Sequence, residues 1–232
     1  MKKPKTSPSK TWQRARSPDQ RQARIDAILE AAGRLLDEGG LDATGLNAIA
    51  REAGMSKPNL YRYFESREAI LLELLLEQVQ GWSRALAKRL APLATDAERV
   101  GPEAAPAIAE AFTAVSVRRR RLWLLLGSLA TVLEQNVGHE TVREFKRTFL
   151  REAEPAFQAL QKALPPMSWD EAYGAIGMLA MAASGMYPHA HPAPVVREVL
   201  AEPEFCGHGV DFKTAVRAHA EAYLTGLLTL RA

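Results

Sequence analysis

The chain has 232 residues, of which 47% are hydrophobic and 25% charged, so it can form one large domain or two modest ones around a substantial core. With 15 glycines and 14 prolines, the composition excludes a collagen-like or low-complexity chain. The single cysteine, Cys206, excludes an intramolecular disulfide framework and is typical of a reducing cytoplasm. The longest stretch without charged residues, 172–196, is interrupted by prolines and is too short for a membrane span. We therefore expect a soluble cytoplasmic protein without a signal peptide.

Positive charge is concentrated at the amino-terminal end of the chain. Before Ile25, the basic residues face only one acidic residue, Asp19, whereas residues 71–232 are close to neutral. Such an excess favours a polyanionic partner, because each cation that neutralises a phosphate releases a condensed counterion. A tail that only aids solubility is the alternative. Residues 1–16 lack apolar periodicity and are predicted to be a disordered basic arm.

Helix starts and stops follow one another closely between residues 17 and 70. The sequence of 17–20, Ser-Pro-Asp-Gln, has the form of a capping box, and an apolar 3–4 repeat follows it up to the glycine pair at 39–40. Two short helices come next, joined by a turn at Gly54. Thr44, Ser56 and Ser66 are the predicted N-caps of these helices and of a longer one that continues towards residue 90.

The rest of the chain also has helical periodicity and no convincing two-residue alternation. The predicted helices span 103–116, 119–136, 140–163, 169–187, 194–201 and 212–230, with a break from Pro188 to Pro194. We predict an all-α protein in three parts: the arm at 1–16, a three-helix helix-turn-helix domain at 17–70, and a larger helical domain at 71–232.

Two short helices joined by a glycine turn, within a unit of about 50 residues, indicate a helix-turn-helix. The order of residues between Ile25 and Leu74 is more specific, and it resembles the TetR family of bacterial transcriptional regulators. The matching positions are Ile28-Leu29-Glu30-Ala31-Ala32, Gly39, Thr44, Ile49-Ala50, Ala53-Gly54-Met55-Ser56, Leu60-Tyr61 and Phe64-Glu65-Ser66-Arg67-Glu68. Two positions depart from the family's usual pattern: Gly45 replaces a second Thr, Ser or Met, and Arg67 replaces a common Lys.

The resemblance implies a regulator that binds a palindromic double-stranded DNA operator, most often as a repressor. The candidate DNA-binding residues are Thr44, Ser56, Lys57, Asn59, Tyr61, Arg62, Tyr63 and Arg67. Asn can read adenine, and Arg or Lys can read guanine, in the major groove. By similarity to the family, Thr44, Tyr61, Tyr63 and Arg67 are expected to contact phosphates. The alternative is that the two tyrosines belong partly to the core and that Arg62 is a solvated charge.

The larger domain is expected to bind a second copy of the chain and a small effector. Residues 172–187, rich in small side chains, and 212–230, with Phe212, Val216, His219, Tyr223, Leu227 and Leu230 at 3–4 spacing, resemble the family's dimer helices. The effector is expected to be apolar or aromatic, and ordinary core packing is the alternative for each residue of the pocket. The candidate pocket residues are Trp82, Phe112, Trp123, Leu126, Phe149, Met178, Met181 and Tyr187.

Other classes of function have weaker support in the sequence. The spacing of His189, His191, Cys206 and His208 matches no four-ligand zinc pattern, so we predict no metal and no cofactor. No phosphate loop, zinc-protease or nucleophile-elbow motif occurs, which disfavours an enzyme. A DNA-binding protein that is controlled by a protein partner instead of a ligand is the second alternative.

Removing residues 1–16 should lower the salt dependence of DNA binding more than it changes the preference among DNA sequences. The reason is that the arm's cations would contact phosphates and release counterions, without reading bases. Fluorescence anisotropy of a labelled duplex at several salt concentrations measures both quantities. An unchanged slope of log affinity against log salt would identify the arm as a passive tail.

Overall fold

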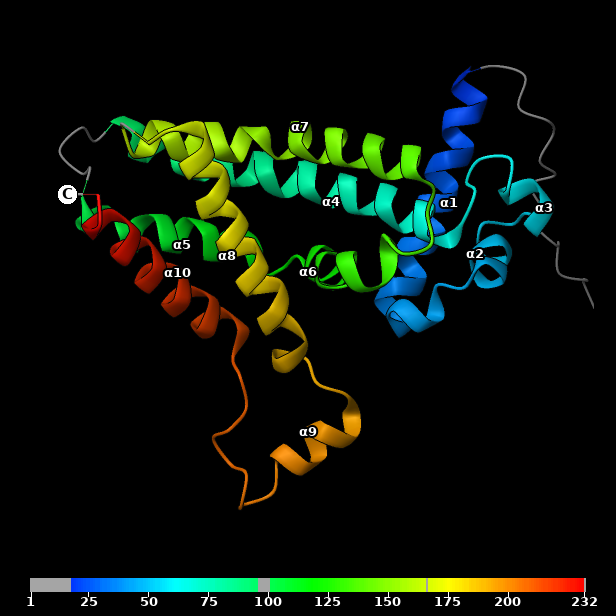
Figure 1. Cartoon of the computed structure of the whole chain (residues 1–232). Helices are drawn as coiled ribbons and strands as arrows, with labels where there is room; N and C mark the ends of the chain where they lie inside the picture. Colours follow the sequence, from blue (N-terminus) through cyan, green and yellow to red (C-terminus); the bar gives the residue numbers. More distant parts are fainter. Residues whose placement is uncertain (1–17, 96–100, 166, 232) are drawn as a thin grey trace, which may run out of the picture. The chain divides into compact units, whose positions relative to one another are not determined.

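The computed structural model describes residues 18–95, 101–165 and 167–231, and every regular element in these ranges is helical (Figure 1). The chain divides into two compact units, residues 1–67 and 68–232, close to the boundary expected at residue 70. The predicted capping box at Ser17 and the basic arm lie outside the described residues. No helix in the described ranges is long and apolar enough to cross a membrane.

The described part of the first unit contains three helices and one short 3-10 turn. They are α1 (Pro18–Gly39), η1 (Leu41–Ala43), α2 (Leu46–Glu52) and α3 (Lys57–Leu60). The glycine pair ends α1 as predicted, and Gly40 takes a φ of 68°, a left-handed conformation that favours glycine. Ile28 of α1, Ile49 of α2 and Leu60 of α3 are fully buried. Each helix of this unit therefore contributes an apolar side chain to the core.

The start of α2 differs from the prediction. Gly45, not Thr44, occupies the N-cap position, and its extended backbone lacks a side chain that could cap the helix. Thr44 lies one residue earlier and is fully buried, with its hydroxyl donating to the carbonyl of Leu41 at 2.7 Å. Ser56 does occupy the N-cap of α3, but its side chain makes no capping hydrogen bond.

The second unit is a set of long and short helices. They are α4 (Arg67–Leu90), α5 (Ala105–Ser116), α6 (Arg120–Gly127), α7 (His139–Ala163), α8 (Trp169–Ala190), α9 (Pro194–Leu200) and α10 (Phe212–Thr229), with short turns η2 (Ala91–Thr95), η3 (Pro102–Ala104) and η4 (Leu129–Leu133). α10 packs against α5 and α8, and α8 also packs against α6 and α7. Two hydrogen bonds join α4 to α7, from Gln80 to Glu152 and from Ser83 to the carbonyl of Ala153.

Aromatic rings form the centre of this unit. Trp82, Phe112 and Trp123 pack against one another with ring centroids 5.8–6.4 Å apart, and Phe212 extends the group from α10. Both indole N–H groups have partners, since Trp82 donates to the hydroxyl and Trp123 to the carbonyl of Ser116. The polar atoms of the buried tryptophans are therefore satisfied, as burial requires.

Two helix boundaries of the second unit differ from the prediction, and both lie where α6 meets α8. The predicted helix 119–136 is interrupted at Ser128, so α6 ends at Gly127 and a π-helical turn follows. α8 continues through Pro188 to Ala190 instead of ending at 187. Proline cannot donate to the carbonyl four residues earlier, that of Ser184. A Cβ on Gly127 would lie 3.3 Å from this carbonyl oxygen, so glycine allows the two helices to approach closely there.

Candidate nucleic-acid interface

The helix-turn-helix consists of α2, the turn at Gly54 and α3. Gly54 has a φ of 68°, and the amide of Met55 donates to the carbonyl of Ala50, which closes the turn. α3 has only four residues, but backbone bonds from Tyr63 and Phe64 to the carbonyl of Leu60 continue the coil beyond it. The recognition segment is therefore residues 57–64, a short helix followed by a tight turn.

The recognition segment buries one side chain of α3 and exposes polar and aromatic ones. Leu60 is fully buried, whereas Lys57, Asn59, Tyr61 and Arg62 are exposed, and 48% of the Tyr61 surface is accessible. The ammonium group of Lys57 lies 5.9 Å from the centroid of the Tyr61 ring, within the range of a cation–π interaction. These side chains offer hydrogen-bond donors and positive charge on the outer side of a helix anchored by one leucine.

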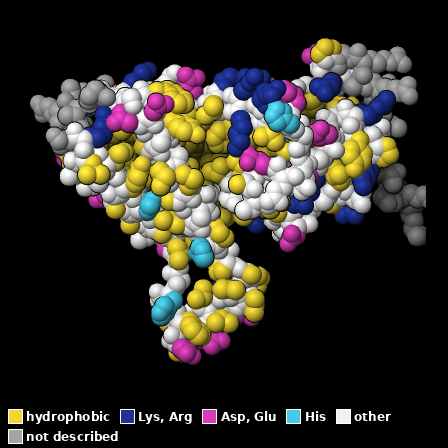
Figure 2. All heavy atoms as spheres, in the orientation of Figure 1, with side chains coloured by type: hydrophobic (Ala, Val, Ile, Leu, Met, Phe, Trp, Pro, Cys, Tyr) yellow, Lys and Arg dark blue, Asp and Glu magenta, His cyan; other side chains and the backbone are white. Residues whose placement is uncertain are grey.

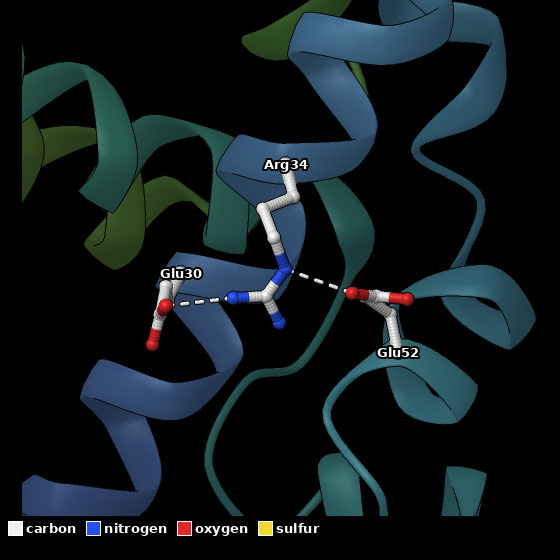
Figure 3. A network of polar contacts seen from close by, with 3 residues as sticks. All are labelled: Glu30, Arg34 and Glu52. Carbon is white, nitrogen blue, oxygen red and sulfur yellow. Dashed lines mark hydrogen bonds and ion pairs between the residues drawn. The ribbon is translucent and has the colours of Figure 1, made fainter.

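A surface network holds α1 against α2 (Figure 3). Arg34 of α1 donates to Glu30 at 2.7 Å and to Glu52 of α2 at 2.8 Å. The hydrogen bond to Glu52 is the main cause that raises the pKa of the Arg34 guanidinium. Because these groups are solvent-exposed, the network adds little to stability, although it links α1 to α2 through one guanidinium group.

The carbonyl of Leu41 is a second anchor, which the sequence analysis did not predict. It accepts from the amide and the hydroxyl of Thr44, at 3.1 and 2.7 Å, and from the guanidinium of Arg67 at 2.8 Å. The loop between α1 and α2 is thereby joined to Arg67, the last residue of the first unit.

The structure gives Thr44 a partner inside the protein. Its hydroxyl is buried and donates to the carbonyl of Leu41, and its phosphate contact stays a prediction. Arg67 is half-buried and also directed at Leu41, with its Nε atom buried and without a hydrogen-bond partner. Among the other predicted residues, Ser56 is exposed and Tyr63 is half-buried, so the outward set consists mainly of residues 56–62.

The predicted pocket residues differ in their surroundings and burial. Trp82, Phe112 and Trp123 form the aromatic centre, and Tyr187 joins it through Phe212, with ring centroids 5.1 Å apart. Leu126 and Phe149 are half-buried, whereas Met178 and Met181 lie exposed on α8.

The run of arginines at 118–121 also has a structural role that the sequence did not indicate. The guanidinium of Arg119 donates to the carbonyl of Gly81 in α4 at 3.1 Å, and a Cβ on Gly81 would lie 3.0 Å from it. In the described ranges, no group of three His, Cys, Asp or Glu side chains is placed to hold a metal ion.

Family descriptions match nearly all of the described chain. Residues 28–74 match "Bacterial regulatory proteins, tetR family", and residues 76–231 match "Tetracyclin repressor-like, C-terminal domain". The chain belongs to the TetR family of transcriptional regulators, whose members are non-enzymatic DNA-binding proteins. The helix-turn-helix and the all-helical fold predicted from the sequence are thereby confirmed.

Similarity to individual curated regulators is limited to part of the chain. It is 37% identical over 75 residues to the uncharacterized HTH-type transcriptional regulator Rv1255c of Mycobacterium tuberculosis, covering 32% of this chain and 37% of that protein. It is 39% identical over 83 residues to the HTH-type transcriptional regulator RutR of Escherichia coli, covering 36% of each chain. The chain thus aligns with little more than a third of either relative's length.

Solved structures agree over most of the chain. A possible TetR family regulator from Streptomyces coelicolor has a TM-score of 0.54 at 18% identity, covering 91% of this chain and all of its own. A TetR-family regulator from a Rhodococcus species has a TM-score of 0.53 at 17% identity, covering 89% of this chain and 99% of its own. At such low identity, these matches establish the fold alone.

Replacing Thr44 by valine separates a structural role from a DNA contact. Thr44→Val keeps the shape of the side chain but removes the donor to Leu41, so the free energy of unfolding should fall by about 1 kcal/mol. Urea denaturation followed by circular dichroism measures the change. DNA affinity should stay at the wild-type value under conditions in which both proteins are folded. Lost affinity at unchanged stability would reinstate Thr44 as a phosphate contact.

Proposed function

We propose that the protein is a cytoplasmic repressor that binds a palindromic operator as a homodimer. The observation that carries this proposal is the recognition segment, in which buried Leu60 fixes a helix whose Lys57, Asn59, Tyr61 and Arg62 are exposed. In the major groove, Asn59 would read adenine, and Lys57 or Arg62 would read guanine. Tyr61 and Tyr63 would donate to phosphates and thereby set the register of the helix on the duplex.

A dimer follows from the size of the recognition segment. One short helix reads only a few base pairs, and two-fold dimers place their recognition helices about 34–36 Å apart. The second unit has an uncharged outer face that suits a second copy. It consists of Gly174, Gly177, Met178, Met181 and Gly185 on α8, and Ala218, Ala222, Thr225, Gly226 and Thr229 on α10. We call this set the α8–α10 face.

The α8–α10 face uses different side chains from those that periodicity suggested. Phe212 and Val216 are buried inside their own chain, as are Ala172, Ala175 and Ala183. The glycines serve another purpose, since a Cβ on Gly174, Gly177 or Gly185 would meet no atom within 4 Å. They are therefore not required by packing inside the chain, and they allow the helices of a second copy to approach closely.

The proposed release from DNA requires an effector that favours one of two conformations of the dimer. Trp82, Phe112, Trp123 and Tyr187 would supply apolar and aromatic contacts to such a ligand. Because these rings pack against one another, directly or through Phe212, a ligand there must displace them. This packing favours the second candidate, a DNA-binding protein controlled by a protein partner. A screen of apolar compounds for loss of DNA binding separates the two, because only the ligand-controlled repressor responds.

Removing either of two outward side chains of the recognition segment should weaken specific binding. Lys57→Ala and Asn59→Ala are each expected to lower operator affinity about 5- to 150-fold, since a good base contact discriminates by about 1–3 kcal/mol. Anisotropy titration with excess random competitor measures the change. Lys88→Ala, which removes an exposed lysine of α4, is the matched control and should bind like the wild type. Wild-type affinity in both test variants would exclude this segment as the reader.

A charge on the α8–α10 face should separate the two subunits. Met181 is 60% exposed, so Met181→Arg is compatible with the folded chain but places a charge in the proposed interface. Sedimentation velocity should show the monomer mass for this variant and the dimer mass for the wild type. Leu150→Arg on α7, which also replaces an exposed apolar residue, should remain dimeric. A dimer of Met181→Arg would place the interface elsewhere.

A further inference from the structure

One hydrogen bond joins the two flanks of the helix-turn-helix. The guanidinium of Arg67 donates to the carbonyl of Leu41 at 2.8 Å. Leu41 lies in η1, before α2, whereas Arg67 comes after the recognition segment. The bond therefore closes a loop that contains α2, the turn at Gly54 and the whole recognition segment. We call this bond the Leu41–Arg67 clasp.

The clasp differs from the other bonds at the same carbonyl in what it connects. The amide and the hydroxyl of Thr44 also donate to Leu41, but they act within the local turn. Arg67 is 26 residues away from Leu41 in the sequence. A bond between segments so far apart restricts the loop between them, which a local turn cannot do.

The side chain of Arg67 is committed to the protein's own backbone. Arg67 is half-buried, and its Nε atom is buried without a hydrogen-bond partner. Such burial of a donor costs free energy. A guanidinium that served only a phosphate would gain nothing from this burial, because an exposed arginine keeps its donors in water. The geometry instead suits a side chain that holds the carbonyl of Leu41.

Other cations of the first unit are more accessible to phosphates. Arg21, Arg51, Lys57 and Arg62 are all exposed. Figure 2 shows Lys and Arg side chains on the visible surface of this unit. Neutralisation of phosphates by the first unit therefore does not depend on Arg67.

We propose that Arg67 is a positioning residue for DNA reading, which holds the flanks of the helix-turn-helix together through the carbonyl of Leu41. The inference rests on the proposed function, since it assumes that residues 57–64 read an operator. A clasped segment enters the groove already ordered, whereas an unclasped one must be ordered during binding, which lowers affinity. The phosphate contact expected for Arg67 from the family resemblance leads to a different dependence on salt.

Replacing Arg67 by methionine separates the two roles. Arg67→Met keeps an unbranched apolar stem but removes the donor, so operator affinity should fall about tenfold, the effect of one such hydrogen bond. The slope of log affinity against log salt and the affinity for random DNA should keep their wild-type values, because no phosphate contact is lost. Anisotropy titrations at several salt concentrations measure all three quantities. The operator duplex is one that the wild-type protein selects from a random library.

Arg89→Met is the matched control, since it removes an exposed arginine near the end of α4 and should change none of the three quantities. In Arg67→Met, a slope smaller by about 0.9 with weaker binding to random DNA would overturn the proposal and identify a phosphate contact. Wild-type operator affinity in Arg67→Met would overturn the proposal as well.

Hydrogen exchange of the free protein gives a second readout that needs no DNA. In Arg67→Met, peptides that cover residues 41–49 should exchange faster than in the wild type, because the loop before α2 loses its distant partner. Peptides that cover residues 24–36 of α1 should change far less, and circular dichroism should show an unchanged helix content. Unchanged exchange at residues 41–49, or equal acceleration in α1, would overturn the positioning role.

The two experiments distinguish failure of the clasp from failure of the proposed function. A wild-type protein that selects no sequence from the library would overturn the proposed function, and the positioning role with it. A wild-type protein that selects an operator, together with unchanged exchange at residues 41–49 in Arg67→Met, would overturn the clasp alone.

Discussion

The burial of Leu60 is the constraint on which the proposed DNA-reading surface depends. A helix as short as α3 is not stable by itself, because too few hydrogen bonds repay the ordering of its backbone. Leu60 supplies the missing stability by joining the core of the first unit, and the same burial decides which side chains remain outside. Lys57, Asn59, Tyr61 and Arg62 are outward because position 60 is inward. The burial of Leu60 therefore sets both the packing of this segment and the side chains proposed to read DNA.

The other interactions of the first unit keep this surface in place. Arg34 joins α1 to α2, and the carbonyl of Leu41 gathers donors from Thr44 and Arg67. The loop before α2 needs this support, since Gly45 leaves the start of the helix without a side-chain cap. Glycine at position 45 departs from the family pattern, and the loop beside it is held by hydrogen bonds from Thr44 and Arg67 to the carbonyl of Leu41. These bonds lie away from the recognition segment but hold the elements that carry it.

The sequence predicted the helices and the exposed recognition residues well, because apolar periodicity and glycine turns are local signals. It failed where a side chain takes a partner that residue type and spacing do not reveal. Threonine is a typical N-cap residue, but the hydroxyl of Thr44 instead donates a hydrogen bond to the carbonyl of Leu41 in the same loop. Pro188 is typical of a helix end, but α8 continues to Ala190, and His191 after it stacks on Tyr187. Likewise, Met178 and Met181 are apolar enough for a pocket, yet they lie on the surface.

Burial of uncharged surface is also the basis of the dimer that we propose for the second unit. In the proposed dimer, the uncharged face on α8 and α10 would be buried against another copy of the chain. The most direct test of the central claim is an anisotropy titration against the DNA upstream of the protein's own gene, with random competitor and at two salt concentrations. We expect saturable binding that survives the competitor. Absence of binding even at low salt would contradict the proposal that this protein is an operator-binding repressor.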